Sequence, residues 1–347
     1  MPRSLSSRLR LLPVLLAALA FAGCDALGGG DEPGPATEKN LLYPVRIEGL
    51  WGYVNAEGRI AALPEFDAAA EFADGMGAVQ VGDAWGYVNQ GGALAVQPAY
   101  AVAGKFSEGL APVKAVGFGG KYGYVGKGGA LVIAAEYDLA EPFSEGLAAV
   151  RKGGQWGYVN ARGEAVIAPA FTDARAFSEG RAAVEGADGW VYVDKAGVVV
   201  VRPGFAIERA GTFSEGRAPF STAEGWGYFD AGGAPVISPR YAEARAFEGG
   251  LAPVRTGEYY GYVSADGVEK VKPQFRDARP FSEGLAAVRI DRRWSFVDGS
   301  GRLAIAQDFE RAGDFRGGLA RVEYGTGAAT KIGYVDRAGA YVWFPTN

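Results

Sequence analysis

The chain has 347 residues, a formal net charge of −5, no histidine and a single cysteine. The absence of histidine excludes Ser-His-Asp and Cys-His nucleophilic sites and nearly all zinc sites. The charge becomes −8 when the three arginines of the first 23 residues are removed, so we expect no nucleic-acid partner, because such partners require positive charge.

Residues 1–23 have the pattern of an export signal. Three arginines without an acidic residue form a positive n-region, and residues 11–21 form an apolar stretch too short to span a bilayer. The following Phe21-Ala22-Gly23-Cys24 resembles the lipobox of bacterial lipoproteins. The resemblance implies that Cys24 carries a lipid that holds the chain to a membrane of the bacterial cell envelope, on its periplasmic or cell-surface side. The alternative is an ordinary secretory signal followed by an incidental cysteine.

Residues 24–40 are predicted to be the lipidated cysteine and a flexible tether. They are rich in glycine and proline and have no apolar periodicity. The sixteen residues after Cys24 would span roughly 22 Å root-mean-square. The remaining chain, residues 41–347, would therefore lie near a membrane rather than in it.

An aromatic-Gly-aromatic tripeptide recurs through residues 41–347. Its first positions lie 34 to 38 residues apart, a period typical of repeat arrays. Six copies are complete and three are degenerate. The nine copies begin at Trp51, Trp85, Tyr122, Trp156, Trp190, Trp226, Tyr260, Trp294 and Ile332.

The copy at residues 156–184 indicates how one repeat folds. Residues 156–160 alternate in the period of a strand and are rich in aromatic and β-branched side chains. A Gly-bearing turn leads to a second strand at residues 166–167, which ends at Pro169. Residues 181–184 form a third strand close to the next copy. Strands connected so closely pair antiparallel, so each repeat is predicted to be a three-stranded meander.

These motifs resemble the bacterial WG-repeat proteins, also called KWG-repeat proteins. The resemblance rests on the nine Trp-Gly-type strands and on a recurring Phe-x-x-Gly element. It implies an exported or surface repeat module without an assigned catalytic activity and with varying copy number. The element begins at Phe72, Phe106, Phe143, Phe177, Phe213, Phe247, Phe281 and Phe315.

We therefore expect an all-β fold, a tandem array of about nine three-stranded antiparallel repeats of about 34 residues. An open, solenoid-like array is favoured, because such a family varies in copy number and because each chain end completes its own meander, at residues 41–59 and 332–344. The alternative is a closed β-propeller, although typical propellers have four to eight blades of four strands.

Carboxylates are the remaining candidates for catalysis or Ca²⁺ binding. Paired carboxylates perform glycoside hydrolysis, but a catalytic pair should be singular. These recur at equivalent turn positions, where turn geometry explains them. We therefore expect no catalytic residue, no metal and no cofactor. They are Asp74, Glu108, Glu145, Glu179, Glu215 and Glu283 before the repeat glycine, and Asp194, Asp230, Asp298 and Asp336 after the aromatic strand.

Most aromatic side chains occupy repeated positions and are predicted to form the core. Phe118 and Tyr324 instead fall in the two enlarged loops, where repeat packing does not explain them. Exposed aromatics stack on sugars or anchor protein partners, so these two are the candidate ligand contacts. The predicted function is an envelope-anchored, non-enzymatic scaffold that binds a protein or polysaccharide. The alternatives are a carboxylate-dependent envelope hydrolase and a purely structural spacer.

Overall fold

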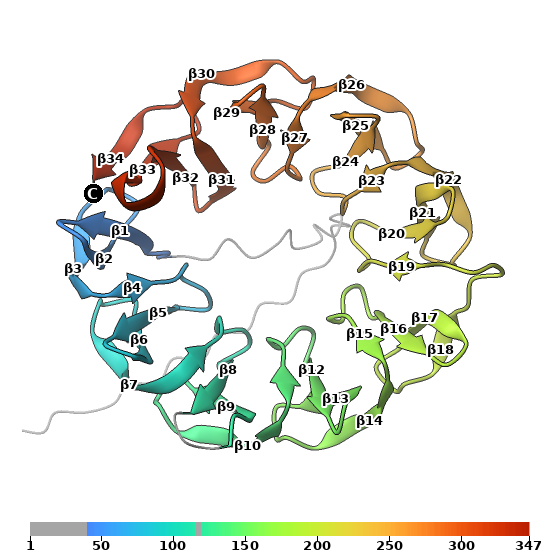
Figure 1. Cartoon of the computed structure of the whole chain (residues 1–347), viewed down its shortest axis with the longest axis horizontal. Helices are drawn as coiled ribbons and strands as arrows, with labels where there is room; N and C mark the ends of the chain where they lie inside the picture. The colour runs from blue at the N-terminus through green and yellow to red at the C-terminus, as the bar shows by residue number, and fades with distance from the viewer. Residues whose placement is uncertain (1–39, 116–118, 347) are drawn as a thin grey trace, which may run out of the picture. The chain divides into compact units, whose positions relative to one another are not determined.

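A computed structural model describes residues 40–115 and 119–346 of the chain. Within these residues the regular elements are antiparallel strands, apart from one 3₁₀ turn, η1 (Gly327–Ala329). The strands form a ring of radial blades (Figure 1). The predicted all-β array of antiparallel repeats is therefore confirmed.

Nine blades are present in the described residues, numbered here in chain order. Blade 1 contains β1 (Tyr43–Ile47), β2 (Leu50–Val54) and β3 (Ile60–Phe66). Blades 2 and 3 share one strand and contain β4 (Ala68–Ala69), β5 (Met76–Val81), β6 (Ala84–Asn89), β7 (Leu94–Ala103), β8 (Leu110–Ala115), β9 (Tyr122–Gly126) and β10 (Leu131–Tyr137). Blade 4 contains β11 (Leu139–Ala140), β12 (Leu147–Lys152), β13 (Gln155–Asn160) and β14 (Ala165–Phe171).

The later blades repeat this order. Blade 5 contains β15 (Asp173–Ala174), β16 (Ala182–Gly186), β17 (Gly189–Val193) and β18 (Val199–Val201), and blade 6 contains β19 (Arg209–Ala210), β20 (Arg217–Thr222), β21 (Gly225–Asp230) and β22 (Pro235–Tyr241). Blade 7 contains β23 (Glu243–Ala244), β24 (Leu251–Thr256), β25 (Tyr259–Ser264) and β26 (Glu269–Phe275). Blade 8 contains β27 (Asp277–Ala278), β28 (Ala286–Ile290), β29 (Arg293–Val297) and β30 (Leu303–Phe309), and blade 9 contains β31 (Arg311–Arg316), β32 (Leu319–Tyr324), β33 (Lys331–Asp336) and β34 (Tyr341–Thr346).

Blades 2 to 9 have four strands rather than the predicted three. The additional strand is the innermost one and is usually only two residues long, as in β15, where Asp173 and Ala174 pair with Glu185 and Val184 of β16. Two residues carry too little alternation to be recognised as a strand in a sequence. Blade 1 lacks this inner strand in the described residues, because β1 pairs only with β2 there.

The Trp-Gly-Tyr strand is the second from the outside and is held by both neighbours. In blade 4, Tyr158 lies opposite Ala149 of β12 and opposite Ile167 of β14. A Cβ atom on Gly157 would lie 2.5 Å from the carbonyl oxygen of Ile167 and 2.6 Å from the nitrogen of Pro169. Glycine is therefore required by the close approach of the outer strand, as the sequence suggests.

In eight of the nine blades a buried tyrosine joins the blade to the next, and blade 8 has Phe296 at this position. Tyr158 is fully buried, and its hydroxyl donates a 2.7 Å hydrogen bond to the carbonyl oxygen of Arg175 in blade 5. Its ring meets that of Phe177 edge-on, with centroids 4.8 Å apart. The same hydroxyl-to-carbonyl bond is made by Tyr53, Tyr87, Tyr124, Tyr192, Tyr228 and Tyr262.

The first and last blades meet, so the open array favoured from the sequence is wrong and the closed propeller is the observed arrangement. Tyr334 of blade 9 donates a 2.9 Å hydrogen bond to the carbonyl oxygen of Pro44 in blade 1. Tyr43 donates in the opposite direction to the carbonyl oxygen of Arg316, at 2.8 Å. The two tyrosine rings pack edge-on at 5.2 Å, and Figure 1 places β1 beside β33. Each blade buries both faces, and closure leaves neither terminal face exposed.

The charged side chain of Arg316 crosses the position where blade 1 lacks an inner strand. The Nη1 of Arg316 in blade 9 lies 3.0 Å from the carboxylate of Glu71 in blade 2. Its Nη2 donates to the carbonyl oxygen of Phe72, at 3.1 Å. The guanidinium therefore links two blades that are not neighbours in the ring.

Candidate functional site

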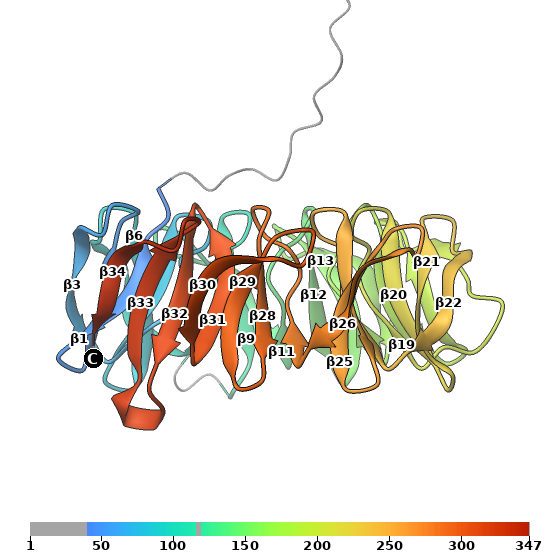
Figure 2. The same ribbon diagram turned by 90° about the horizontal axis from the view of Figure 1, so that it is seen from above.

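The ring has two rims that differ in the loops they carry. We call one the turn face, because it carries the Ser-Glu-Gly turns between the first and second strands of a blade and the Asn-x-x-Gly turns between the third and fourth. The other is the hairpin face, which carries the hairpins between the second and third strands. The hairpin between β32 and β33 projects beyond its neighbours on this face (Figure 2).

The recurring carboxylates of the turn face hold neighbouring blades together. Glu145 has a left-handed backbone, with φ 55°, and its carboxylate accepts a 3.0 Å hydrogen bond from the backbone N–H of Gly180 in the next blade. The other carboxylates at this position have φ between 48° and 54° and accept the same bond. The pairs are Asp74 with Gly109, Glu108 with Gly146, Glu179 with Gly216, Glu215 with Gly250 and Glu283 with Gly318.

These bonds assign the carboxylates a structural task in addition to the turn. A serine one residue earlier makes a second link, since the hydroxyl of Ser144 donates to the carbonyl oxygen of Phe177 at 2.7 Å. The carboxylates that follow the aromatic strand stay within their own turns, as when Asp230 accepts from the N–H groups of Gly232 and Ala234, both at 2.9 Å. Neither set forms the isolated carboxyl pair that glycoside hydrolysis needs.

This arrangement predicts a modest stability loss when one link is removed. Glu179→Ala is expected to lower the free energy of unfolding by about 0.5–1 kcal/mol, because the Gly216 N–H loses a charged acceptor at an exposed site. Glu179→Gln retains an acceptor oxygen and should lose less. Denaturation midpoints measure both, and equal midpoints for Glu179→Ala and the unaltered protein would contradict the proposed link.

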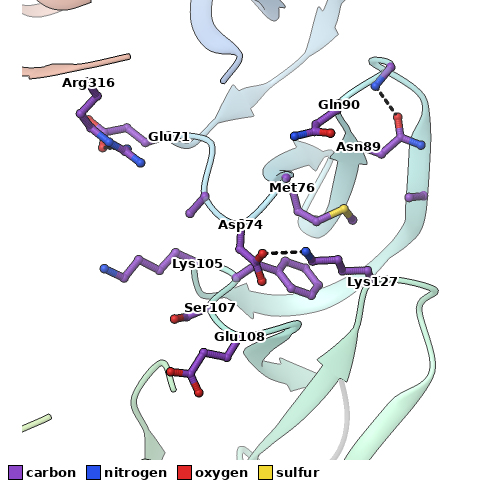
Figure 3. A pocket seen from close by; sticks show the side chains of 15 residues that line it. Glu71, Asp74, Met76, Asn89, Gln90, Lys105, Ser107, Glu108, Lys127 and Arg316 are labelled. Atoms are coloured by element: carbon purple, nitrogen blue, oxygen red, sulfur yellow. Dashed lines mark hydrogen bonds and ion pairs between the residues drawn. The ribbon is translucent and has the colours of Figure 1, made fainter. Parts of the chain in front are cut away.

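A large recess lies on the turn face where blades 2 and 3 meet (Figure 3). Its volume is about 1250 Å³. Two small residues line it: Ala73 stands where most repeats have serine, and Gly91 occupies the turn position that carries Arg162 in blade 4. Buried Met76 and Phe106 form its apolar part.

The polar lining of the recess carries both charges. Lys127 lies 2.7 Å from the carboxylate of Asp74, which also accepts the 2.6 Å bond from Gly109. The Arg316 and Glu71 pair closes the side nearest blade 9. Lys105 adds a further positive charge, as Figure 3 shows. An open recess of this size and polarity suits part of a polymer better than a small apolar molecule, which fits a largely enclosed apolar pocket.

Sequence reasoning did not identify this recess. Its lining turns depart from the repeat consensus at Ala73, which stands where most copies have serine. The residues that the sequence did single out lie elsewhere. Cys24 and Phe118 fall outside the described residues, and Tyr324 ends β32.

Tyr324 has a packing role that the sequence did not indicate. It is half-buried, its ring meets that of Phe309 edge-on at 5.8 Å, and its hydroxyl is hydrogen-bonded to that of Tyr341. Part of its surface stays accessible on the hairpin face. Whether it contacts a ligand remains a prediction.

Across residues 40–115 and 119–346, no group of three or more histidine, cysteine, aspartate or glutamate side chains is arranged to hold a metal ion. The part of the chain that the structure describes also contains no helix long and apolar enough to cross a membrane.

The family assignment agrees with this repeat structure. The WG containing repeat family matches residues 51–83, 85–115, 122–156, 156–189, 226–260, 260–294 and 294–325. Because these segments cover more than half of the sequence, the chain belongs to the WG containing repeat family. The degenerate copies at Trp190 and Ile332 begin outside the matched segments. No curated protein matches the sequence.

The chain is similar to solved structures at low sequence identity. A structure described as the crystal structure of the eukaryotic initiation factor is 13% identical, with a TM-score of 0.61, over 88% of this chain and 95% of that one. The structure of apo AztD from Citrobacter koseri is 14% identical, with a TM-score of 0.44, over 88% of this chain and 93% of that one. The first likeness supports the fold, and we infer nothing from the second.

Proposed function

We propose that this protein is a non-enzymatic scaffold, anchored to the bacterial cell envelope by a lipid on Cys24, that binds a protein or polysaccharide. The observation that carries the proposal is the engagement of the recurring carboxylates with the next blade, as in the bond from Gly180 to Glu145. Groups used for holding blades together are poor candidates for a hydrolase. The open recess between blades 2 and 3 favours a binding role over that of a spacer.

The position of the domain's first described residue supports anchoring from the turn face. Asn40 precedes β1 at the place that Glu145 occupies before β12, and its φ of 65° is similarly left-handed. A tether that joins the ring at Asn40 therefore joins it at the turn face. The recess lies on this same face, within reach of an envelope polymer near the membrane.

Anchoring is tested by removing the acylation site. Cys24→Ala should release the protein from the membrane fraction, because the lipid is its only proposed attachment. Fractionation after a high-salt wash measures this. A variant that still sediments with the membranes would rule out the lipid anchor.

Binding at the recess is tested by filling it. Gly91→Arg places in blade 2 the residue that blade 4 carries naturally as Arg162, so the fold should tolerate it. The matched control is Gly232→Arg, at the same turn of blade 6. A Cβ atom added to either glycine would have as its nearest neighbour the side-chain oxygen of the residue two positions earlier in the chain, at 3.3 Å.

Capture of partners from envelope extract should fall for Gly91→Arg and be retained for Gly232→Arg. Equal capture by the two variants would remove the recess as the binding site. No specific capture by the unaltered protein would favour the structural spacer.

A further inference from the structure

The interface between blades 7 and 8 is built differently from its neighbours. At the turn face, blade 7 has Gly249 where blades 2 to 6 and blade 8 have a carboxylate, and Glu248 where blades 3 to 6 and blade 8 have serine. Neither link to blade 8 is therefore available there. On Gly284 of blade 8, the equivalent of Gly180, an added Cβ atom would lie 3.3 Å from the guanidinium of Arg337.

Arg245 of blade 7 supplies the missing connection nearer the hairpin face. One of its terminal nitrogens lies 3.0 Å from the carboxylate of Asp277 in blade 8, and the other donates to the carbonyl oxygen of Ala278 at 2.5 Å. Its Nε lies 3.1 Å from Glu243, and the guanidinium stacks over the ring of Tyr260 at 4.7 Å.

Because Asp277 pairs with Arg245, a second arginine, Arg289, does not pair with the carboxylate of Asp277. Asp277 lies directly opposite Arg289 in the register of β27 and β28, but it pairs with Arg245 and accepts from the N–H of Ala278. The Nε of Arg289 is buried and has no hydrogen-bond partner among the described residues. At the equivalent position of blade 4, Arg151 donates its Nε to the carbonyl oxygen of Gly154 at 3.1 Å.

Arg289 lines a recess of about 540 Å³ on the hairpin face. Four arginines and three carboxylates surround this recess. Each carboxylate has an arginine partner: Glu243 pairs with Arg245 and, at 3.7 Å, with Arg255, Asp277 pairs with Arg245, and Glu258 pairs with Arg276 at 2.7 Å. The recess therefore has one guanidinium in excess of its carboxylates, and Arg289 carries it.

We infer that this recess binds a carboxylate from an acidic segment of a protein partner, with Arg289 as the principal contact and Arg255 beside it. The inference rests on the proposed scaffold function and names one partner class for it. A guanidinium binds a carboxylate through two parallel hydrogen bonds, which suits Arg289. Arginine and tyrosine also carry much of the binding energy at protein interfaces.

The surroundings favour a peptide over an acidic polysaccharide. Sugar recognition uses open aromatic faces, but the guanidinium of Arg276, which lines the recess, is stacked over the ring of Tyr259 at 4.5 Å. Tyr260 is buried, with 4% of its surface exposed, and its ring is covered by Arg245. The groups that face the recess are mainly charged, and an acidic side chain neutralises the excess positive charge of Arg289.

The test is binding of a labelled hexaglutamate peptide to the full chain at low ionic strength, measured by fluorescence anisotropy. Arg289→Gln should weaken binding about tenfold, because the peptide loses a charge-assisted pair of hydrogen bonds. Arg151→Gln is the matched control and should leave binding unchanged. Equal melting temperatures of the two variants establish that a loss is not due to unfolding.

Two results would overturn the inference. One is that the unaltered protein does not bind hexaglutamate, or that both variants weaken its binding equally. The other is binding of polygalacturonate, but not hexaglutamate, that depends on Arg289, which would assign the recess to an acidic polysaccharide. Neither measurement involves the Gly91→Arg variant. A negative result for the Arg289 recess is therefore distinguishable from a negative result for binding at the recess between blades 2 and 3.

Discussion

A chain that ends at Val322 is expected to unfold or aggregate. This truncation removes β33 and β34, and with them the bond from Tyr334 to Pro44 and the ring contact with Tyr43. It exposes the apolar core that blades 1 and 9 share, which includes Leu41, Leu42 and Leu319. In a closed ring this loss destabilises both sides of the seam, whereas an open array would lose only one interface.

Far-UV circular dichroism and size-exclusion chromatography measure this result. Tyr334→Phe is the control, because it removes only the hydroxyl and leaves the blade in place. This variant should remain folded and lose about 1 kcal/mol of stability. A truncated chain that stays soluble and monomeric, with only a small loss of β signal, would show that the closure contributes little.

The strands of each blade could be predicted from the sequence because their signals are local. Trp156 and Tyr158 lie on one strand and Ile167 lies on the next strand of the same repeat. A short turn joins these two strands, which pair with each other. The two-residue inner strands carry no such signal. Closure could not be predicted either, because it depends on the angle between successive blades, and the Tyr334 and Pro44 contact joins residues 290 positions apart.

The role of the turn carboxylates was only half visible in the sequence. Glu145 and Gly146 indicate a turn, and the structure has both with positive φ. The link from Glu145 to Gly180 spans 35 residues, about one repeat, so both partners recur with the same period. A regular period identifies such residues as equivalent but does not distinguish contacts within one blade from contacts between two.

The excess charge of Arg289 was hidden for a similar reason. A pairing of adjacent strands suggests that Asp277 neutralises it, and the register places the two residues opposite each other. The competing arginine, Arg245, comes from the preceding blade. Its reach across the interface depends on how the blades pack, which no single repeat contains.

Raising the pH above about 10 is expected to unfold the ring steeply. Eight tyrosines at the same position of successive blades are buried between them, and burial raises the pKa of each hydroxyl far above its ordinary value. In blade 8 the position is held by Phe296. The eight are Tyr53, Tyr87, Tyr124, Tyr158, Tyr192, Tyr228, Tyr262 and Tyr334.

The direction of this pH dependence follows from whether the folded or the unfolded state binds more protons. Unfolded tyrosines lose their protons near pH 10, while the folded protein retains them, so above this pH the unfolded state binds fewer protons. Stability is thus fully present below pH 10 and falls as the pH rises. Each buried tyrosine contributes a loss of about 1.4 kcal/mol by pH 11, and eight together about 11 kcal/mol. This is comparable to the whole stability of a typical protein.

Circular dichroism and tyrosinate absorbance should therefore change together in one cooperative step near pH 11. Replacing Tyr124, Tyr158 and Tyr192 by phenylalanine provides the control. The triple variant is less stable at pH 7, because three carbonyl oxygens lose their donors, but its stability should fall less steeply with pH. Gradual ionisation near pH 10 with an unchanged circular dichroism spectrum would mean that these hydroxyls reach solvent without unfolding, and that the blades are not joined through a buried belt of tyrosines.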